Sequence, residues 1–140
     1  MSQQNVEIVE EIYEQVSQGH TEVLYERLDP KVEWDTTTSD FPDAGLYHGH
    51  DGVREYRRRF WGTWEAQRNE PEELIDAGDS VVAVVRMGGR GKGSGIEIDQ
   101  WFAWLWTFSE GKVIRVAVYQ DRAEALEAAG LSQQDAHTDS

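Results

Sequence analysis

The spacing of apolar and polar residues changes about halfway along the chain, from a helical repeat to the alternation of strands. In the first half, apolar residues recur three and four positions apart, as on one face of an amphipathic helix. In the second half they alternate or run together, as in strands of a sheet. The first half predicts helices at residues 3–17, 21–28 and 51 to about 68, and a short strand at 31–37.

The second half predicts antiparallel strands joined by glycine-containing turns. The glycine-rich run GGRGKGSG, residues 88–95, is expected to be a flexible hairpin loop, because it lacks the ending of a phosphate-binding loop. Asp121 stands three residues before Glu124, a spacing that predicts the N-cap of a last helix. The predicted strands are residues 73–77, 80–87, 96–108 and 112–120, and the last helix is 122–129.

The strand predicted at residues 96–108 has large apolar side chains on both of its faces from Trp101 onward. Burial of each large aromatic side chain contributes roughly 1.5–3 kcal/mol, so both faces should be covered. Helices of the same chain can cover one face. We expect a second copy of the chain to cover the other, which predicts a homodimer through the outer face of the sheet.

Length and charge limit the classes of partner that the protein can have. A chain of 140 residues is long enough for one domain, which we place at residues 1–131, followed by a polar and disordered tail at 132–140. The formal net charge of −14 argues against nucleic acid and anionic membranes as partners. The sequence contains no cysteine and no membrane-spanning apolar run, and its first residues are acidic and amphipathic, so we expect no signal peptide there. We therefore expect a cytoplasmic protein without a cofactor.

Six segments of the chain together resemble a SnoaL-like polyketide cyclase domain of the nuclear transport factor 2-like superfamily, to which ketosteroid isomerase also belongs. They are VEIVEEIYEQVSQGH, LDPKVEWD, GLYHGHDGVREY, LIDAGDSVVAVVR, WTFSEGKVIRV and VYQDRAEALEAAGL. The resemblance covers about residues 3–131. It implies an α+β cone, in which a curved antiparallel sheet wraps around three N-terminal helices and a short C-terminal helix follows. It also implies a pocket at the open end and, usually, a homodimer.

Asp35 is the first candidate for a catalytic residue, since it falls where ketosteroid isomerase has its catalytic aspartate. A carboxylate in a partly apolar site could transfer protons next to a carbonyl group. The alternative is a solvent-facing acid that bonds the backbone of Thr36 or Thr37. His48 is a candidate acid–base partner of Asp35. A metal site at His48 and His50 lacks an evident third ligand, and we expect none.

The isomerase mechanism does not transfer intact, because its oxyanion-binding tyrosine falls on Ile12 and its second acid on Ala103 or Trp104. We expect aromatic residues, with one glutamine, to line a pocket for a steroid, terpene or polyketide-like molecule. In the alternative, the tryptophans fill the pocket and the protein is a non-catalytic dimer. The arginines from Arg54 to Arg59 are interpreted as a solvated helix face. The candidate ligand-binding residues are Tyr13, Trp34, Tyr56, Phe60, Trp64, Gln100, Phe102, Trp104, Trp106 and Tyr119.

Overall fold

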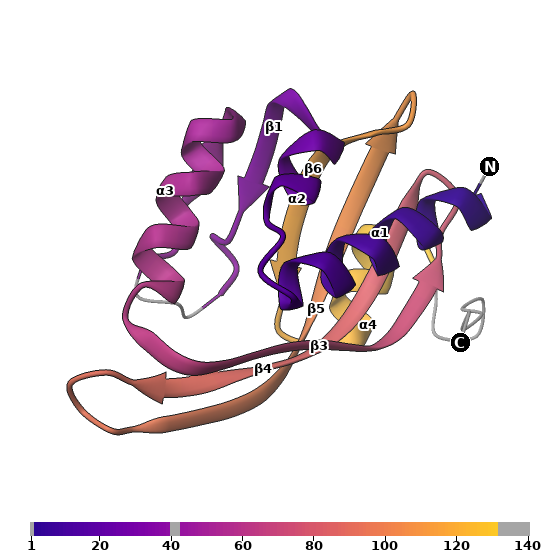
Figure 1. The fold of residues 1–140 in the computed structure, drawn as a ribbon. Helices are drawn as coiled ribbons and strands as arrows, with labels where there is room; N and C mark the ends of the chain where they lie inside the picture. The colour runs from indigo at the N-terminus through magenta and orange to yellow at the C-terminus, as the bar shows by residue number, and fades with distance from the viewer. Residues whose placement is uncertain (1, 40–42, 132–140) are drawn as a thin grey trace.

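The computed structural model describes residues 2–39 and 43–131, and four helices and a six-stranded sheet lie in this part of the chain (Figure 1). The predicted tail at 132–140 lies outside the described residues. The helices are α1 (Ser2–Ser17), α2 (Glu22–Arg27), α3 (Gly49–Trp61) and α4 (Arg122–Ala128). The strands are β1 (Leu28–Asp35), β2 (Leu46–His48), β3 (Trp64–Asp76), β4 (Ser80–Gly91), β5 (Glu97–Ser109) and β6 (Lys112–Tyr119).

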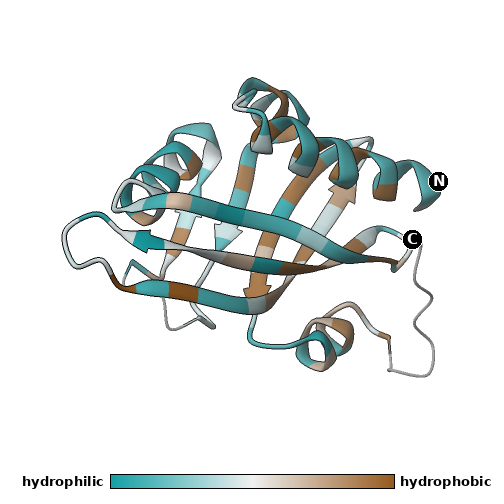
Figure 2. Cartoon of the chain, turned by 60° about the horizontal axis from the view of Figure 1, so that its bottom comes forward, coloured by the Kyte–Doolittle hydropathy of each residue, from teal (hydrophilic) through white to brown (hydrophobic). Residues whose placement is uncertain are grey.

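The six strands form one open sheet in the order β2-β1-β6-β5-β4-β3. Neighbouring strands are antiparallel except β1 and β6, which run parallel, so the sheet is mixed. Helices α1, α2 and α3 lie on one side of the sheet and α4 on the other (Figure 2). The predicted α+β class and its cone-like architecture are therefore confirmed, with one parallel strand pair that the sequence pattern did not indicate.

The predicted third helix is too long, because α3 ends at Trp61 and β3 begins at Trp64. The apolar repeat through Val53, Tyr56 and Phe60 continues to Trp64 by coincidence of spacing. After Gly62 the backbone leaves the helix, and β3 pairs with β4 from Trp64 opposite Gly91 onward. Pairing with β4 provides partners for the backbone N–H and C=O groups of this polar segment.

Part of the glycine-rich run also belongs to the sheet and not to a loop, which corrects the prediction for residues 88–91. Gly88 pairs with Asp99 in β5, and a Cβ added at Gly88 would lie 2.2 Å from the carbonyl oxygen of Ile98. Glycine is required here because the two backbones approach so closely. The β4–β5 hairpin therefore extends well beyond the helices (Figure 1).

The apolar core is divided by the sheet into two clusters. The larger one lies between the sheet and the three N-terminal helices and contains Trp34, Trp104 and Trp106. The smaller one lies on the outer face, where Leu105 of β5 packs with Leu126 of α4. Two-sided burial of β5 is thus confirmed at Leu105, which is 6% exposed. The expectation that a second copy of the chain covers this face was wrong at Leu105, because α4 of the same chain covers it.

The start of α4 is capped as predicted. The Asp121 carboxylate accepts a hydrogen bond of 2.9 Å from the backbone N–H of Glu124, which is the N-cap arrangement. The helix leaves part of the outer face uncovered. Trp101, on that part, is 50% exposed, and its indole N–H donates to Glu72 at 2.8 Å.

Candidate functional site

Three adjoining hollows lie on the side of the sheet that faces the N-terminal helices. The smallest lies between α1, α3 and the aromatic residues of the sheet, and we call it the closed cavity because the rings leave only about 40 Å³ of free space in it. The apolar pocket, of about 470 Å³, lies toward the β4–β5 hairpin. The polar pocket, of about 480 Å³, lies between the end of α1, α3 and the start of β3. Trp61, the last residue of α3, lines all three hollows.

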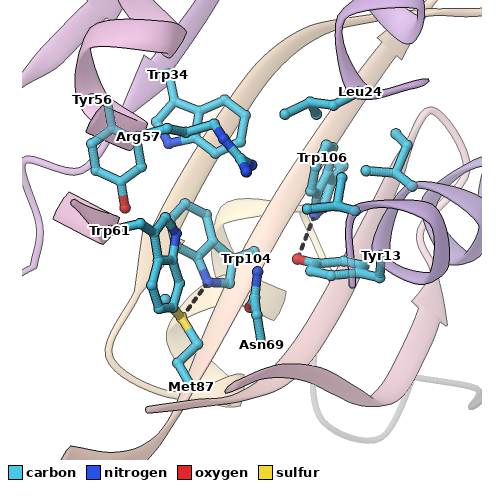
Figure 3. Close-up of a pocket in the computed structure, with 12 residues that line it drawn as sticks. Tyr13, Leu24, Trp34, Tyr56, Arg57, Trp61, Asn69, Met87, Trp104 and Trp106 are labelled. Atoms are coloured by element: carbon cyan, nitrogen blue, oxygen red, sulfur yellow. Dashed lines mark hydrogen bonds between the residues drawn. The ribbon is translucent and has the colours of Figure 1, made fainter. Parts of the chain in front are cut away.

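The closed cavity is filled mainly by aromatic rings (Figure 3). The Trp34 ring lies 5.8 Å from the rings of Tyr56, Trp104 and Trp106, measured between ring centroids. Trp104 also donates its indole N–H to the sulfur of Met87 at 3.2 Å. The remaining space suits a few water molecules or a small polar group, since one water needs roughly 10–15 Å³, and it excludes an aromatic ring.

Several polar groups face the closed cavity without a partner among the described residues. They are Trp34 Nε1, Tyr56 Oη and Asn69 Oδ1, each of which is buried. Tyr13 Oη does accept a hydrogen bond from Trp106 Nε1, at 3.2 Å. Buried polar atoms normally have a partner, so each of these atoms indicates where a ligand or water would bind.

Burial has a strong effect on both tyrosines of the closed cavity. It raises the pKa of Tyr13, against the smaller opposing effect of its bond to Trp106. Burial likewise raises the pKa of Tyr56, and the positive charge of Arg57 and the nearby Trp34 N–H oppose it only weakly. Trp34 and Tyr56 do not reach hydrogen-bond geometry with each other. Both tyrosines are therefore neutral at physiological pH and can donate a proton to a hydrogen bond.

The apolar pocket has the size and lining of a site for a small organic molecule. Its volume lies in the usual range of roughly 300–1,000 Å³ for such sites. Gln100 and Gln120 supply amide groups at an otherwise mainly apolar surface. Two further lining residues, Ile96 and Ile98, are among the exposed apolar side chains. The other lining residues are Phe60, Trp61, Trp64, Met87, Gly88, Gly89, Ser94 and Phe102.

The comparison with protein families agrees with this architecture. The model of the SnoaL-like domain matches residues 9–116, which is most of the chain. The chain belongs to the SnoaL-like domain family. Among proteins with curated functions, no significant match was found. The resemblance noted in the sequence is thus confirmed at the level of the family.

Several solved structures share the fold of this SnoaL-like domain. An NTF2-like protein from Burkholderia thailandensis is 27% identical, with a TM-score of 0.76 over 83% of this chain and 89% of that one. An NTF2-like protein of unknown function from Burkholderia pseudomallei is 25% identical, with a TM-score of 0.74 over 89% and 95%. TerC, co-crystallised with polyporic acid, is 23% identical, with a TM-score of 0.72 over 91% and 98%.

The predicted ligand-binding residues divide between two of the hollows, with one exception. Tyr119 lies on the outer face, where it packs against the cluster beneath α4, so it does not meet the others. Trp64 reaches the apolar pocket from β3, where a helix was expected. The closed cavity contains Tyr13, Trp34, Tyr56, Trp104 and Trp106, and the apolar pocket contains Phe60, Trp64, Gln100 and Phe102.

Asp35 lies on the face of the sheet opposite the three hollows. Alternation along β1 directs Trp34 toward the cavity and the next residue away from it. The carboxylate accepts hydrogen bonds from Thr37 N at 2.9 Å, Thr37 Oγ1 at 2.6 Å and Arg115 Nη2 at 2.5 Å. Burial acts to raise the pKa of Asp35, but Thr37 and Arg115 outweigh it and hold the pKa below its usual value. This geometry matches the alternative interpretation of Asp35 as a turn residue.

The histidines do not join Asp35 in one site. His48 is exposed at the end of β2, opposite Glu33 in the neighbouring strand. His50 is the second residue of α3, and its Nε2 lies 2.9 Å from the carbonyl oxygen of Leu28. Over residues 2–39 and 43–131, no group of three His, Cys, Asp or Glu side chains gathers to hold a metal ion. No helix in these residues is long and apolar enough to cross a membrane.

Several residues of the site were not predicted from the sequence, among them Gln120 of the apolar pocket and three residues around the closed cavity. Trp61 and Arg57 come from α3, and Asn69 comes from β3. Trp61 was missed because the helix was expected to continue beyond it. Arg57 was missed because it lies in a run of arginines that reads as a solvated face. Only the pairing of the other arginines in that run, seen in the structure, distinguishes Arg57 from them.

Asp35→Asn is expected to lower the free energy of unfolding at pH 7 by about 1 kcal/mol, a modest loss because the ion pair with Arg115 is only partly buried. The pKa of folded Asp35 lies below its ordinary value of 3.8. The stabilisation is therefore present above about pH 5 and disappears as the pH falls below 3.8. Urea unfolding at pH 7 and at pH 3 measures this. An equal difference between variant and wild type at both pH values would contradict the assigned ionisation.

Proposed function

We propose that this SnoaL-like domain binds a small, planar hydrophobic molecule of the steroid, terpene or polyketide-like kind in the apolar pocket. The observation that carries the proposal is the pocket itself, with about 470 Å³ between aromatic side chains and two glutamine amides. Flat aromatic walls favour flat ligands, and a small number of polar groups fixes their orientation. Gln100 and Gln120 would bind a carbonyl or hydroxyl group of the ligand.

The family and fold support a ligand of this kind. SnoaL-like domains commonly bind small hydrophobic molecules. TerC, whose fold is similar, was crystallised with polyporic acid. In this chain the closed cavity is too small for a ring system, because Trp34, Trp104 and Trp106 occupy it. The interpretation that tryptophans fill the interior therefore applies to the closed cavity, while the apolar pocket beyond Trp61 has room for a ligand.

Proton transfer by Asp35, with His48 as its partner, stays a prediction. The position of Asp35 on the outer face separates it from a ligand in the apolar pocket by the thickness of the sheet. An ionised carboxylate in an ion pair is also a weaker base than one held in an apolar site. If Asp35→Asn and His48→Gln abolish turnover of a molecule that still binds, the catalytic role is established. Unchanged turnover by both variants would refute a catalytic role for Asp35 and His48.

Blocking the apolar pocket tests the proposal directly. Gln100→Trp places a large ring inside the pocket, and we expect at least a tenfold loss of affinity for a neutral planar probe, 2-naphthamide, measured by isothermal titration calorimetry. Glu97→Trp is the matched control, because it adds the same ring to the same strand on the outer face. It should bind like the wild type. Equal binding by all three proteins, or none by the wild type, would contradict the proposal.

We also propose a homodimer that uses the part of the outer face left uncovered by α4. The centre of this surface is Trp101, whose ring packs beneath the guanidinium of Arg86 at 5.3 Å. Arg86 in turn forms a two-pronged ion pair with Asp99, at 2.8 and 2.6 Å. A half-exposed tryptophan surrounded by paired charges resembles the centre and rim of a protein interface.

A further inference from the structure

Arg57 differs from the other arginines of this acidic chain. On the same helix, Arg54 pairs with Asp51, and Arg58 and Arg59 pair with Glu55. Among the arginines of the chain, Arg57 alone makes neither a hydrogen bond nor an ion pair with any described residue. The arginines outside this helix that form ion pairs are Arg27, Arg68, Arg86, Arg90, Arg115 and Arg122. In a protein with a net charge of −14, carboxylate partners are abundant. Its lack of a partner therefore reflects where it points.

Arg57 points away from the carboxylates of the surface and toward the hollows. It lines both the closed cavity and the polar pocket, and it is half-buried. Figure 3 shows its side chain reaching from α3 toward the middle of the closed cavity. A guanidinium carries a permanent positive charge and up to five N–H donors, which suit the two oxygens of a carboxylate. Withdrawal from water without a partner is costly, so the site favours an anion.

The atoms around Arg57 supply further donors for the same group. Trp34 is 6% exposed and its indole N–H has no partner, and Tyr56 is 1% exposed with a hydroxyl that has none. Both groups can donate to an anionic oxygen. Asn69 Oδ1 is also unpartnered, and rotation of its amide by 180° would present an N–H₂ donor in its place. Arginine, indole, hydroxyl and amide donors therefore converge on one small space.

We propose that the ligand of this domain is an organic acid, with its ionised carboxylate bound by Arg57, Trp34 and Tyr56. The inference rests on the proposed function, because the planar body of the same molecule would lie in the apolar pocket. Trp61 lines all three hollows and so stands between the two ends of the ligand. The body packs against Trp61, and the carboxylate extends past it to Arg57.

The negative charge of the whole protein does not prevent this binding. At physiological ionic strength, exposed charges are screened beyond about 8 Å, so the nearest groups decide the local potential. The acidic residue that lines the polar pocket, Glu70, is already paired with Arg68 at 3.0 Å. A cationic ligand would meet the unpaired guanidinium and no free carboxylate among the described lining residues.

Two probes that differ only in charge test the inference. We would measure the affinities of 2-naphthoate and 2-naphthamide by isothermal titration calorimetry with the wild type, Arg57→Gln, Arg57→Lys and Arg58→Gln. Arg58 is the matched control, because it lies on the same helix and pairs with Glu55 at the surface. The wild type should bind the acid at least tenfold tighter than the amide. Arg57→Gln should lose about ten- to hundredfold for the acid and less than twofold for the amide.

The remaining outcomes separate this inference from the proposed function. Arg57→Lys should recover part of the affinity for the acid, since it keeps the charge, and Arg58→Gln should bind like the wild type. Equal affinity of the wild type for acid and amide overturns the acid-binding role alone, even if the Arg57→Gln protein does not fold. Failure of both probes to bind the wild type overturns the proposed function and this inference together.

Discussion

Replacing Trp106 with alanine should lower the free energy of unfolding by about 3–5 kcal/mol, the usual cost of removing a large buried aromatic side chain. Trp106 is 2% exposed. Its ring makes edge-to-face contacts with Tyr13 at 5.6 Å and with Trp34 at 5.8 Å. It also donates the hydrogen bond that Tyr13 Oη accepts, so the substitution removes packing and a buried polar contact together.

Urea unfolding followed by far-UV circular dichroism measures this loss. Trp106→Phe is an intermediate case, because it keeps most of the ring but removes the indole N–H. We expect it to cost about 1–3 kcal/mol, the penalty for a buried polar group that loses its partner. Ile98→Ala, on the same face of the same strand but 38% exposed, is the control and should cost less than about 1 kcal/mol. A loss below 1 kcal/mol for Trp106→Ala would contradict the described core.

Replacing Trp101 with alanine should weaken the proposed homodimer about thirtyfold or more, the usual effect of removing a central tryptophan from an interface. The side chain is half-exposed in the single chain, and its contacts with Arg86 and Glu72 hold it in one orientation. A side chain fixed in this way loses little conformational freedom on association. Sedimentation equilibrium over a range of protein concentrations measures the dissociation constant.

Ile96→Ala is the matched control for the dimer, since Ile96 is also an exposed apolar residue but lines the apolar pocket on the other face. Its dimer should be as stable as that of the wild type. If the wild type sediments as a single chain at all concentrations, the proposed dimer is refuted. A dimer that Trp101→Ala leaves intact would place the interface on another surface.

The two faces of β5 show how far the sequence pattern could lead. Strict alternation assigned Phe102, Trp104 and Trp106 to the side of the N-terminal helices, and the structure places them there. The same pattern indicated that Leu105 must also be covered. The pattern could not indicate which element covers Leu105, because the alternation of a strand shows which side chains are buried and not what buries them. Leu105 is covered by α4, the helix that follows β6 in the chain and packs on the outer face of the sheet.

The candidate site was partly accessible from the sequence for the same reason. The sequence predicted which aromatic residues lie near the cavity, because strand alternation assigns each residue to a face and large aromatic side chains favour the buried face. The resemblance singled out Asp35 by its family position, and the structure places its carboxylate on the face of the sheet opposite the hollows. Its immediate neighbour Trp34 faces the cavity, and adjacent residues of a strand point to opposite faces. A catalytic position of the family can therefore be assigned to this chain only if the residue points to the same face of the sheet as in the family.

By itself, the sequence determined the elements whose signals are local: the amphipathic face of α1, the turn at Gly111, the cap at Asp121 and the two apolar faces of β5. Only the tertiary structure decided where α3 ends, what covers Leu105 and that Arg57 has no carboxylate beside it. The physical reason is that these properties depend on pairing between segments far apart in the chain. No local pattern of residues records such pairing.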